Sequence, residues 1–193
     1  MMISSKKTLV FFFFFFLFFS ISLAFSSTKQ SLKKKQHQPC KELVVYYHDI
    51  LYNGHNSDNA TSTLIGAPDG ANLTTLSRPF RFGDMAVFDD PINLDNNLHS
   101  SPIGRAQGSY IYNGKNTLRA WMGFSILFNS TQYQGIVTFV GADLILMESR
   151  DMPVVGGTGD FFMHRGVATL MTDRDEGEAY YRLKINIKFY ECW

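Results

Sequence analysis

The C-terminal segment of this chain alternates strictly between apolar and polar side chains. Over residues 181–189 the odd positions are apolar and the even positions polar: Tyr181, Leu183, Ile185, Ile187 and Phe189, then Arg182, Lys184, Asn186 and Lys188. A period of two is that of a β-strand with one buried face and one face in water. The chain is therefore expected to fold around a β-sheet.

Six other segments have comparable strand patterns, and turn signals separate them. The predicted strands are Leu43 to Tyr52, Phe80 to Phe88, Ala106 to Tyr112, Leu118 to Phe128, Gly135 to Met147 and Phe161 to Thr172. The predicted turns are Asn53-Gly54, Asp89-Asp90-Pro91, Asn113-Gly114 and the run Pro153 to Gly159. No long helical pattern interrupts the series, so we predict a single all-β domain, either a sandwich or a barrel.

The glycine run Gly156-Gly157-Thr158-Gly159 is not a phosphate-binding loop. It lacks the Gly-Lys-Ser/Thr that would follow in such a loop, and no helical pattern begins after it. We interpret the run as a bulged turn.

The segment Gly135 to Met147 is nearly all apolar. On a barrel, such a strand has one face on the interior and the other face covered, most simply by a neighbouring subunit. We therefore expect a homo-oligomer.

The first residues of the chain predict a signal peptide. Lys6 and Lys7 give it a positive start, Leu9 to Phe19 is wholly apolar, and Ala24-Phe25-Ser26 offers small residues at cleavage spacing. A membrane anchor is the alternative, but the apolar run is well short of the roughly 20 residues that a spanning helix needs. We expect a signal peptide over residues 1–26, a flexible basic leader over 27–39 and the folded domain of a secreted protein over 40–193.

The cysteines and the glycosylation sequons agree with secretion. Cys40 and Cys192 are the two cysteines of the chain, and in an oxidising compartment they should pair, with two free thiols as the alternative. Closing so long a loop would stabilise the fold by at most about 5 kcal/mol in the chain-entropy model. Three Asn-X-Ser/Thr sequons, at Asn59, Asn72 and Asn129, predict N-glycosylation.

Charge and motif content disfavour several classes of function. The formal net charge is only +1, and the basic cluster Lys33 to Lys35 has no interleaved aromatic residues, so nucleic-acid binding is disfavoured. The histidines show no metal-ligand spacing, and no serine lies in a Gly-X-Ser-X-Gly elbow. We expect no metal, no cofactor and no serine hydrolase.

Two aspartates lie on strand faces that should be buried. Asp49 shares a face with Val45 and Tyr47, and Asp143 is the charged residue of the apolar segment that contains Phe139. Either carboxylate could simply hold a strand in place through hydrogen bonds. Two carboxyl groups in an apolar chamber would instead have raised pKa values and could act as general acids.

Further residues could bind a ligand beside these carboxyl groups. Arg150 follows the Asp143 strand, and it could keep a carboxylate ionised, orient a phenol, bind an anionic ligand or form a plain surface ion pair. Tyr110 and Tyr112 share one face of their strand, and Tyr181 lies on the apolar face of the last strand. Aromatic rings on an inner wall suit a planar ligand, although core packing is the commoner explanation for any one of them.

Eight segments of the chain carry a resemblance to a known family. They are Pro39-Cys40-Lys41-Glu42-Leu43, Tyr47-His48-Asp49-Ile50-Leu51-Tyr52, Asn59-Ala60-Thr61-Ser62, Val87-Phe88-Asp89-Asp90-Pro91, Gly104-Arg105-Ala106-Gln107-Gly108, Gly141-Ala142-Asp143, Val155-Gly156-Gly157-Thr158-Gly159-Asp160-Phe161-Phe162-Met163 and Tyr190-Glu191-Cys192-Trp193. From Cys40 to Trp193 the chain resembles the dirigent family, in particular its pinoresinol-forming members.

The resemblance implies an eight-stranded antiparallel β-barrel like that of allene oxide cyclases, assembled as a trimer. It implies that a separate laccase or peroxidase oxidises coniferyl alcohol, and that the barrel guides 8–8′ coupling of the radicals to optically active pinoresinol in the apoplast or cell wall. Asp49 and Asp143 would then supply acid for ring closure of the quinone methides. By the same resemblance Arg150, Tyr110, Tyr112, Thr172 and Tyr181 line the pocket.

Two other functions remain open from the sequence. The first is a cyclase or dehydratase that uses Asp49 and Asp143 on a closed-shell substrate. The second is a non-catalytic defence or cell-wall protein that uses the barrel only as a scaffold, because a fold alone does not fix a function.

Overall fold

The computed structural model describes residues 38–65, 82–176 and 179–193. The predicted signal peptide, residues 27–37 of the predicted leader and the sequon at Asn72 lie outside these residues. Within the described ranges no helix has the length and apolar character to cross a bilayer.

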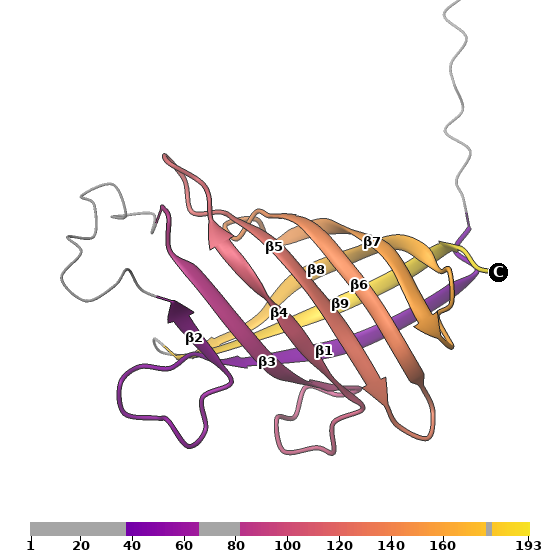
Figure 1. Ribbon diagram of the computed structural model, residues 1–193, viewed down its shortest axis with the longest axis horizontal. Helices are drawn as coiled ribbons and strands as arrows, with labels where there is room; N and C mark the ends of the chain where they lie inside the picture. Colours follow the sequence, from indigo (N-terminus) through magenta and orange to yellow (C-terminus); the bar gives the residue numbers. More distant parts are fainter. Residues whose placement is uncertain (1–37, 66–81, 177–178) are drawn as a thin grey trace, which may run out of the picture. The chain divides into compact units, whose positions relative to one another are not determined.

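The described part of the chain folds into nine antiparallel strands (Figure 1). In chain order they are β1 (Lys41–Ile50), β2 (Ser62–Ile65), β3 (Met85–Asn93), β4 (Gly104–Tyr112), β5 (Ala120–Asn129), β6 (Gln134–Asp143), β7 (Ser149–Gly159), β8 (Arg165–Glu176) and β9 (Tyr180–Glu191).

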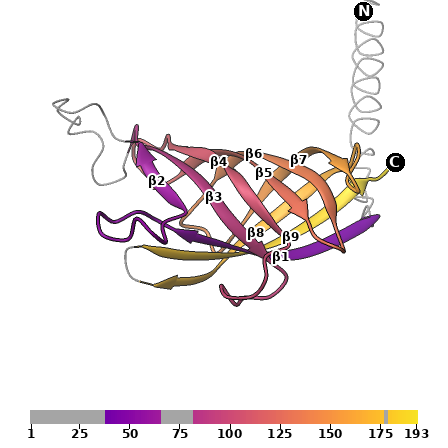
Figure 2. The same ribbon diagram turned by 60° about the horizontal axis from the view of Figure 1, so that its bottom comes forward.

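Eight of these strands close into a barrel, which confirms the predicted architecture. The strand order is β1-β9-β8-β7-β6-β5-β4-β3, and β3 pairs back with β1 through Tyr46–Asn93 and Tyr47–Ile92. The short strand β2 is an addition that pairs with β3 (Figure 2). It was not predicted because its four residues are too few to show a period.

The chain that leads into β2 fills a gap between β1 and β3. Beyond Tyr47–Ile92 these two strands separate, and Thr61 bridges them. Its backbone N–H donates to Ile50 O at 2.8 Å, and its carbonyl accepts from the N–H of Asp89 at 2.9 Å. The residues of β1 and β3 that follow the Tyr47–Ile92 pair therefore lie on either side of the start of β2.

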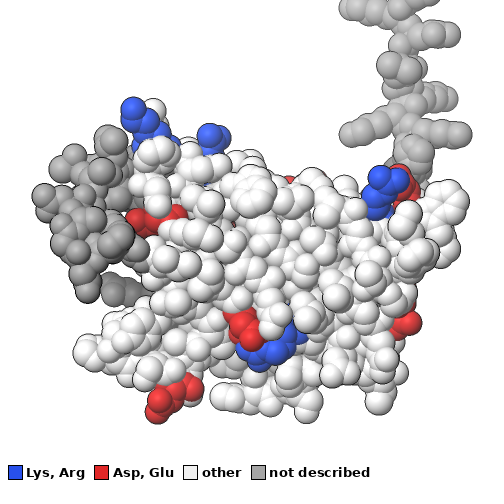
Figure 3. Space-filling view, in the orientation of Figure 1, with Lys and Arg blue, Asp and Glu red and all other residues white. Residues whose placement is uncertain are grey.

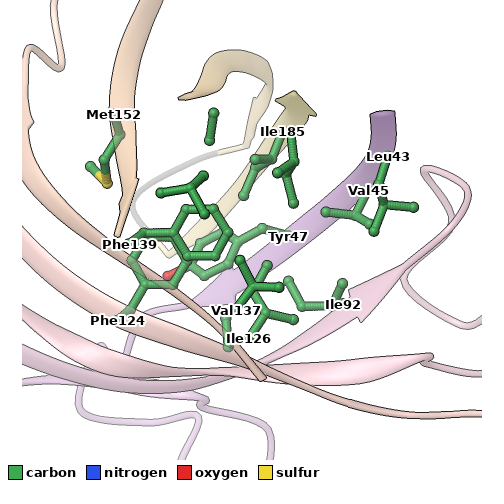
Figure 4. Close-up of a cluster of buried hydrophobic side chains, with 14 of the residues drawn as sticks. Leu43, Val45, Tyr47, Ile92, Phe124, Ile126, Val137, Phe139, Met152 and Ile185 are labelled. Carbon is green, nitrogen blue, oxygen red and sulfur yellow. The ribbon is translucent and has the colours of Figure 1, made fainter. Parts of the chain in front are cut away.

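The core consists of the inward-facing residues of the eight barrel strands (Figure 4). Their alternation with exposed residues is the period of two seen in the sequence. Phe124 and Phe139 stack across β5 and β6 with their ring centroids 4.6 Å apart, and Val45, Ile126 and Ile185 are also buried in this cluster.

Strand β3 corrects one prediction. The sequence placed a strand over Phe80 to Phe88 and a turn at Asp89-Asp90-Pro91, but β3 runs through this tripeptide to Asn93. The strand can continue through both aspartates because their side chains point to opposite faces of the sheet. The Asp89 side chain lies on the outer face, where it pairs with Arg105, and the Asp90 side chain lies in the interior.

Strand β7 corrects a second prediction. The run Pro153 to Gly159 was expected to be a turn, yet it forms the second half of β7. The expected bulge is present, because Thr138 pairs with Gly156 while Phe139 pairs with Val154, which leaves Val155 as the extra residue. Gly157 is needed in this strand because a Cβ there would meet the carbonyl oxygens of Phe161 and Ile136.

Cys40 and Cys192 form the predicted disulfide, with their Cα atoms 6.3 Å apart. Cys40 precedes β1 and Cys192 follows β9, and these two strands pair along their whole lengths, from Lys41–Phe189 to Ile50–Tyr180. The disulfide therefore links the start of the first strand to the end of the last strand of the chain.

The outer face around β4 to β7 carries few charged side chains (Figure 3). Large apolar residues are exposed on these strands, among them Ile111, Trp121, Ile136 and Val155. Isolated apolar residues are normal on the surface of a monomer, whereas a larger exposed apolar face is typical of an interaction surface.

Candidate functional site

One end of the barrel opens into a pocket of about 730 Å³. The ends of β1, β4, β6 and β8 and the beginnings of β5, β7 and β9 meet at this end, because successive strands are antiparallel. All seven predicted site residues line the pocket: Asp49, Tyr110, Tyr112, Asp143, Arg150, Thr172 and Tyr181. Residues from six strands, far apart in the sequence, are thus brought to one cavity.

Arg150 and Asp143 form an enclosed ion pair in this pocket. The Nε of Arg150 donates to Oδ1 of Asp143 at 2.6 Å, and the two side chains are only 4% and 11% exposed. The guanidinium also donates from Nη1 to the Thr172 hydroxyl at 3.0 Å. The predicted alternative of a plain surface ion pair is therefore wrong for Arg150, because the pair lies inside the pocket.

Asp49 lines the same pocket and is hydrogen-bonded to a neutral group. Its Oδ1 accepts a hydrogen bond from the Ser62 hydroxyl at the start of β2. Burial raises the pKa of Asp49 to about 6, and the Ser62 hydrogen bond only partly opposes that increase. This carboxyl group can therefore carry a proton at mildly acidic pH, as a general acid must.

Asp90 is a third interior carboxyl group, and the sequence analysis assigned it to a turn. Its side chain is fully buried on β3. Burial, and secondarily the charge of Asp49, raise the pKa of Asp90 to about 8, against the opposing effects of Thr61, Tyr47 and Arg105. The alternation of β3 could have revealed it, since Ala86, Phe88, Asp90 and Ile92 all lie on one face.

Tyr47 lies between this third carboxyl group and the pocket. The residue lines the pocket and is almost completely buried. Burial raises the pKa of the Tyr47 phenol, and the neighbouring Asp90 and Asp49 raise it further. The phenol therefore stays protonated and can donate a hydrogen bond.

Aromatic rings form one wall of the cavity. Tyr110 and Tyr112 meet edge to face with their ring centroids 5.4 Å apart, and Phe88 contacts Tyr110 at 6.1 Å and Tyr47 at 5.7 Å. These rings are held in place by one another, so they offer a preformed apolar surface to a planar ligand.

The charged groups of the pocket are few, and they come from different strands of its wall. The ion pair of Asp143 and Arg150 is one, and the Asp49 carboxyl group is another. Among the described residues, no group of three or more His, Cys, Asp and Glu side chains is arranged to hold a metal ion. The arrangement can bind an apolar ring system, orient a phenolic oxygen and transfer protons.

Comparison with known proteins agrees with the barrel fold. The model of the family described as Dirigent-like protein matches residues 40–189. The chain is 58% identical over 161 residues to a protein named Dirigent protein from Sinopodophyllum hexandrum, with 83% of each chain covered. It is 48% identical over 160 residues to Dirigent protein 5 of Arabidopsis thaliana, with 83% of this chain and 85% of that protein covered.

A solved structure has the same fold. It is that of the pterocarpan synthase dirigent protein PsPTS1, which is 25% identical and has a TM-score of 0.62. The match covers 80% of this chain and 99% of that one. Since the family model spans the whole barrel and close relatives match over most of their length, this chain belongs to the dirigent-like protein family.

Proposed function

We propose that this protein guides the 8–8′ coupling of two coniferyl alcohol radicals to optically active pinoresinol in lignan biosynthesis. A separate laccase or peroxidase removes one electron and one proton from each alcohol, and the barrel holds the two radicals while the carbon–carbon bond forms. The observation that carries the proposal is the pocket itself, which is large, mostly apolar and lined by few charged groups. Two phenylpropanoid rings bury considerable apolar area and need only such sparse anchors.

Selectivity of this kind requires little energy. A difference of about 1.4 kcal/mol between two competing geometries gives a tenfold preference. The rigid aromatic wall of Tyr110 and Tyr112 and the fixed guanidinium of Arg150 can supply such a difference, because they favour one placement of the rings over its mirror image.

We propose that the pocket also assists ring closure after coupling. Coupling yields a bis-quinone methide, and each ring closes when a side-chain hydroxyl adds to a methide carbon. In that step the phenolic oxygen gains a proton and the attacking hydroxyl loses one, so the step needs a donor and an acceptor but no net proton. Protonated Asp49 is suited to be the donor, since the pKa of its carboxyl group is raised.

Asp143 is suited to the other part of this step. One of its carboxyl oxygens, Oδ1, lies 2.6 Å from the Nε of Arg150, and the pair lines the same pocket. We therefore assign Asp143 the acceptor role and Arg150 the orientation of the phenolic oxygen, instead of two identical acids.

The same proposal places the protein outside the cell, in the apoplast or cell wall, as an N-glycosylated trimer. The disulfide between Cys40 and Cys192 suits an oxidising compartment. Asn59 and Asn129 are both exposed, as acceptors of a glycan must be. The apolar outer face around β4 to β7 is the surface that we assign to the contact between subunits.

The test is chiral chromatography of the pinoresinol formed from coniferyl alcohol and laccase, with and without the protein. The protein alone should leave coniferyl alcohol unchanged, and in the presence of laccase it should enrich one enantiomer. Replacing Asp89 by Asn on the outer face is the matched control and should keep the enrichment. A racemic product at saturating protein would disprove the proposal.

A second candidate is ring formation on a closed-shell substrate. It is favoured by the fold similarity to a protein described as a pterocarpan synthase and by the acid and the ion pair on one pocket. The probe is a benzylic alcohol that can lose water to give a quinone methide. Conversion of this probe without laccase, abolished by Asp49→Asn, would favour the second candidate over the first.

A further inference from the structure

Asp49 and Asp90 lie on either side of the place where the barrel is closed by its first and third strands. Tyr47–Ile92 is the last pair between β1 and β3. Two residues further along β1 and two residues back along β3 are Asp49 and Asp90. Both share the inward-facing side of their strands with this last pair, because side chains alternate along a strand.

Neutral groups surround the two carboxyl groups. Thr61 and Ser62 fill the gap between the strands, and Ser62 donates its hydroxyl to Asp49. Tyr47 and Thr61 contribute hydroxyl groups beside Asp90 and partly lower the pKa of its carboxyl group. Neither carboxyl oxygen of Asp90 makes a hydrogen bond of normal geometry, although both are buried.

Within residues 38–65, 82–176 and 179–193, the arginines near this pair form ion pairs with other carboxylates. Arg105 on β4 lowers the pKa of Asp90 only slightly, because its exposed side chain lies on the outer face in an ion pair with Asp89. Arg150 is paired with Asp143. Two nearby carboxylates in an apolar interior cannot both ionise readily unless a cation is enclosed with them, and the described part of the chain places no ion-pair partner on either.

We propose that Asp49 and Asp90 act as one carboxyl pair that keeps a single proton at neutral pH, with Asp90 as the buried member that sets the charge of Asp49. Asp49 lines the pocket and exchanges its proton with the substrate, while Asp90 is a positioning residue that does not reach the pocket. The part of this inference that concerns substrate rests on the proposed function, whereas the shared proton does not.

The shared proton can be measured without any substrate. A protonated carboxyl group has an infrared carbonyl stretch that a carboxylate lacks, so the unsubstituted protein should show this band at neutral pH and lose it as the pH is raised above about 8, the pKa of Asp90. Asp90→Asn should abolish the band at neutral pH. Asp89→Asn, a substitution at the adjacent exposed position, should leave it unchanged.

The reciprocal variant tests whether the two groups form a pair. Asp49→Asn removes the charge that raises the pKa of Asp90, so the carbonyl band should persist but disappear at lower pH than in the unsubstituted protein. A midpoint that does not move would overturn the pairing. The proposal would also be overturned if the unsubstituted protein showed no carbonyl band at neutral pH, or if Asp90→Asn left that band unchanged. The measurement on the unsubstituted protein does not depend on whether any variant folds.

The pH profile of stereoselectivity connects the pair to function. Above the pKa of Asp90 both carboxyl groups are ionised, so enantiomeric enrichment should fall on the alkaline side in the unsubstituted protein. In Asp90→Asn this fall should move to lower pH, because the remaining carboxyl group, Asp49, has a pKa of about 6, so enrichment should persist at mildly acidic pH and already be low at neutral pH. A uniform loss at every pH would show a purely structural role, and a racemic product together with the expected infrared band would contradict the proposed function while leaving the proton-sharing pair intact.

Discussion

Arg150 donates a 2.6 Å hydrogen bond to Asp143 although each residue lies at the end of a different strand. Asp143 is the last residue of β6 and Arg150 the second of β7, so a short connection brings the two charges to the same side of the pocket. Thr172 on β8 then accepts a second hydrogen bond from the guanidinium. Three successive strands therefore fix the orientation of one cation.

Arg150→Ala should reduce both stability and stereoselectivity. It leaves the Asp143 carboxylate buried without a partner, which costs about 3–5 kcal/mol in comparable pairs. Urea unfolding and chiral chromatography measure the two effects. Arg165→Ala is the control, because the exposed pair of Arg165 with Glu191 contributes little. Equal effects of the two substitutions would contradict the role of the buried pair.

Asp90→Asn should change the pH dependence of stability in a direction set by the raised pKa. The folded pKa is about 8, and an exposed aspartate has a value of about 4. Between these values the folded protein holds a proton that the unfolded chain has released, so the Asp90 contribution to stability falls as pH rises.

Asparagine removes this contribution. Relative to the unsubstituted protein, the free energy of unfolding of the variant should increase by at most about 1.4 kcal/mol for each pH unit between about 4 and 8. Urea unfolding at a series of pH values, with the disulfide intact, measures the difference. The free energy of unfolding of Asp89→Asn should depend on pH in the same way as that of the unsubstituted protein. A difference in free energy between Asp90→Asn and the unsubstituted protein that does not vary with pH would contradict the expectation.

Gly157→Ala should destabilise the barrel, whereas Gly156→Ala should not. A Cβ at Gly157 would meet the carbonyl oxygens of Phe161 and Ile136, but a Cβ at Gly156 has open space around it. The expected loss is about 1–3 kcal/mol, as for other overpacked sites. Thermal unfolding of the two variants provides the comparison. Equal unfolding midpoints would contradict the close contact of Gly157 with the carbonyl oxygens of Phe161 and Ile136.

Removal of the disulfide by a double Cys40→Ser, Cys192→Ser substitution should lower the free energy of unfolding by about 2–5 kcal/mol. The chain remains able to pair β1 with β9, so the circular dichroism spectrum of the folded protein should stay that of a β-barrel. A reductant should lower the stability of the unsubstituted protein toward that of the variant and leave the variant unaffected.

The sequence predicted the strands whose alternation is unbroken and missed those with turn residues inside them. Residues 181–189 lie within β9 as predicted. β7 was not predicted because Pro153 and its glycines are typical of turns, and only the neighbouring backbone shows that the glycines are required by close packing. The register of each pair depends on contacts between distant segments, which a local pattern does not contain.

The same distinction applies to the candidate site. Asp49 and Asp143 could be found because each interrupts an apolar face. Asp90 was missed because Asp89-Asp90-Pro91 is a typical turn sequence, and its burial depends on the gap between β1 and β3. The partner of each charge, Arg150 for Asp143 and Ser62 for Asp49, follows from how the strands meet.

The disulfide between Cys40 and Cys192 makes the folded domain a covalent ring. A protease that cuts this ring once, for example in the loop that connects β3 to β4, leaves a single molecule whose two pieces separate only after reduction. The polypeptide could equally begin and end in that loop, with the segments around Cys40 and Cys192 joined by a linker, and every strand would keep its neighbours. In this sense the barrel has no natural first strand.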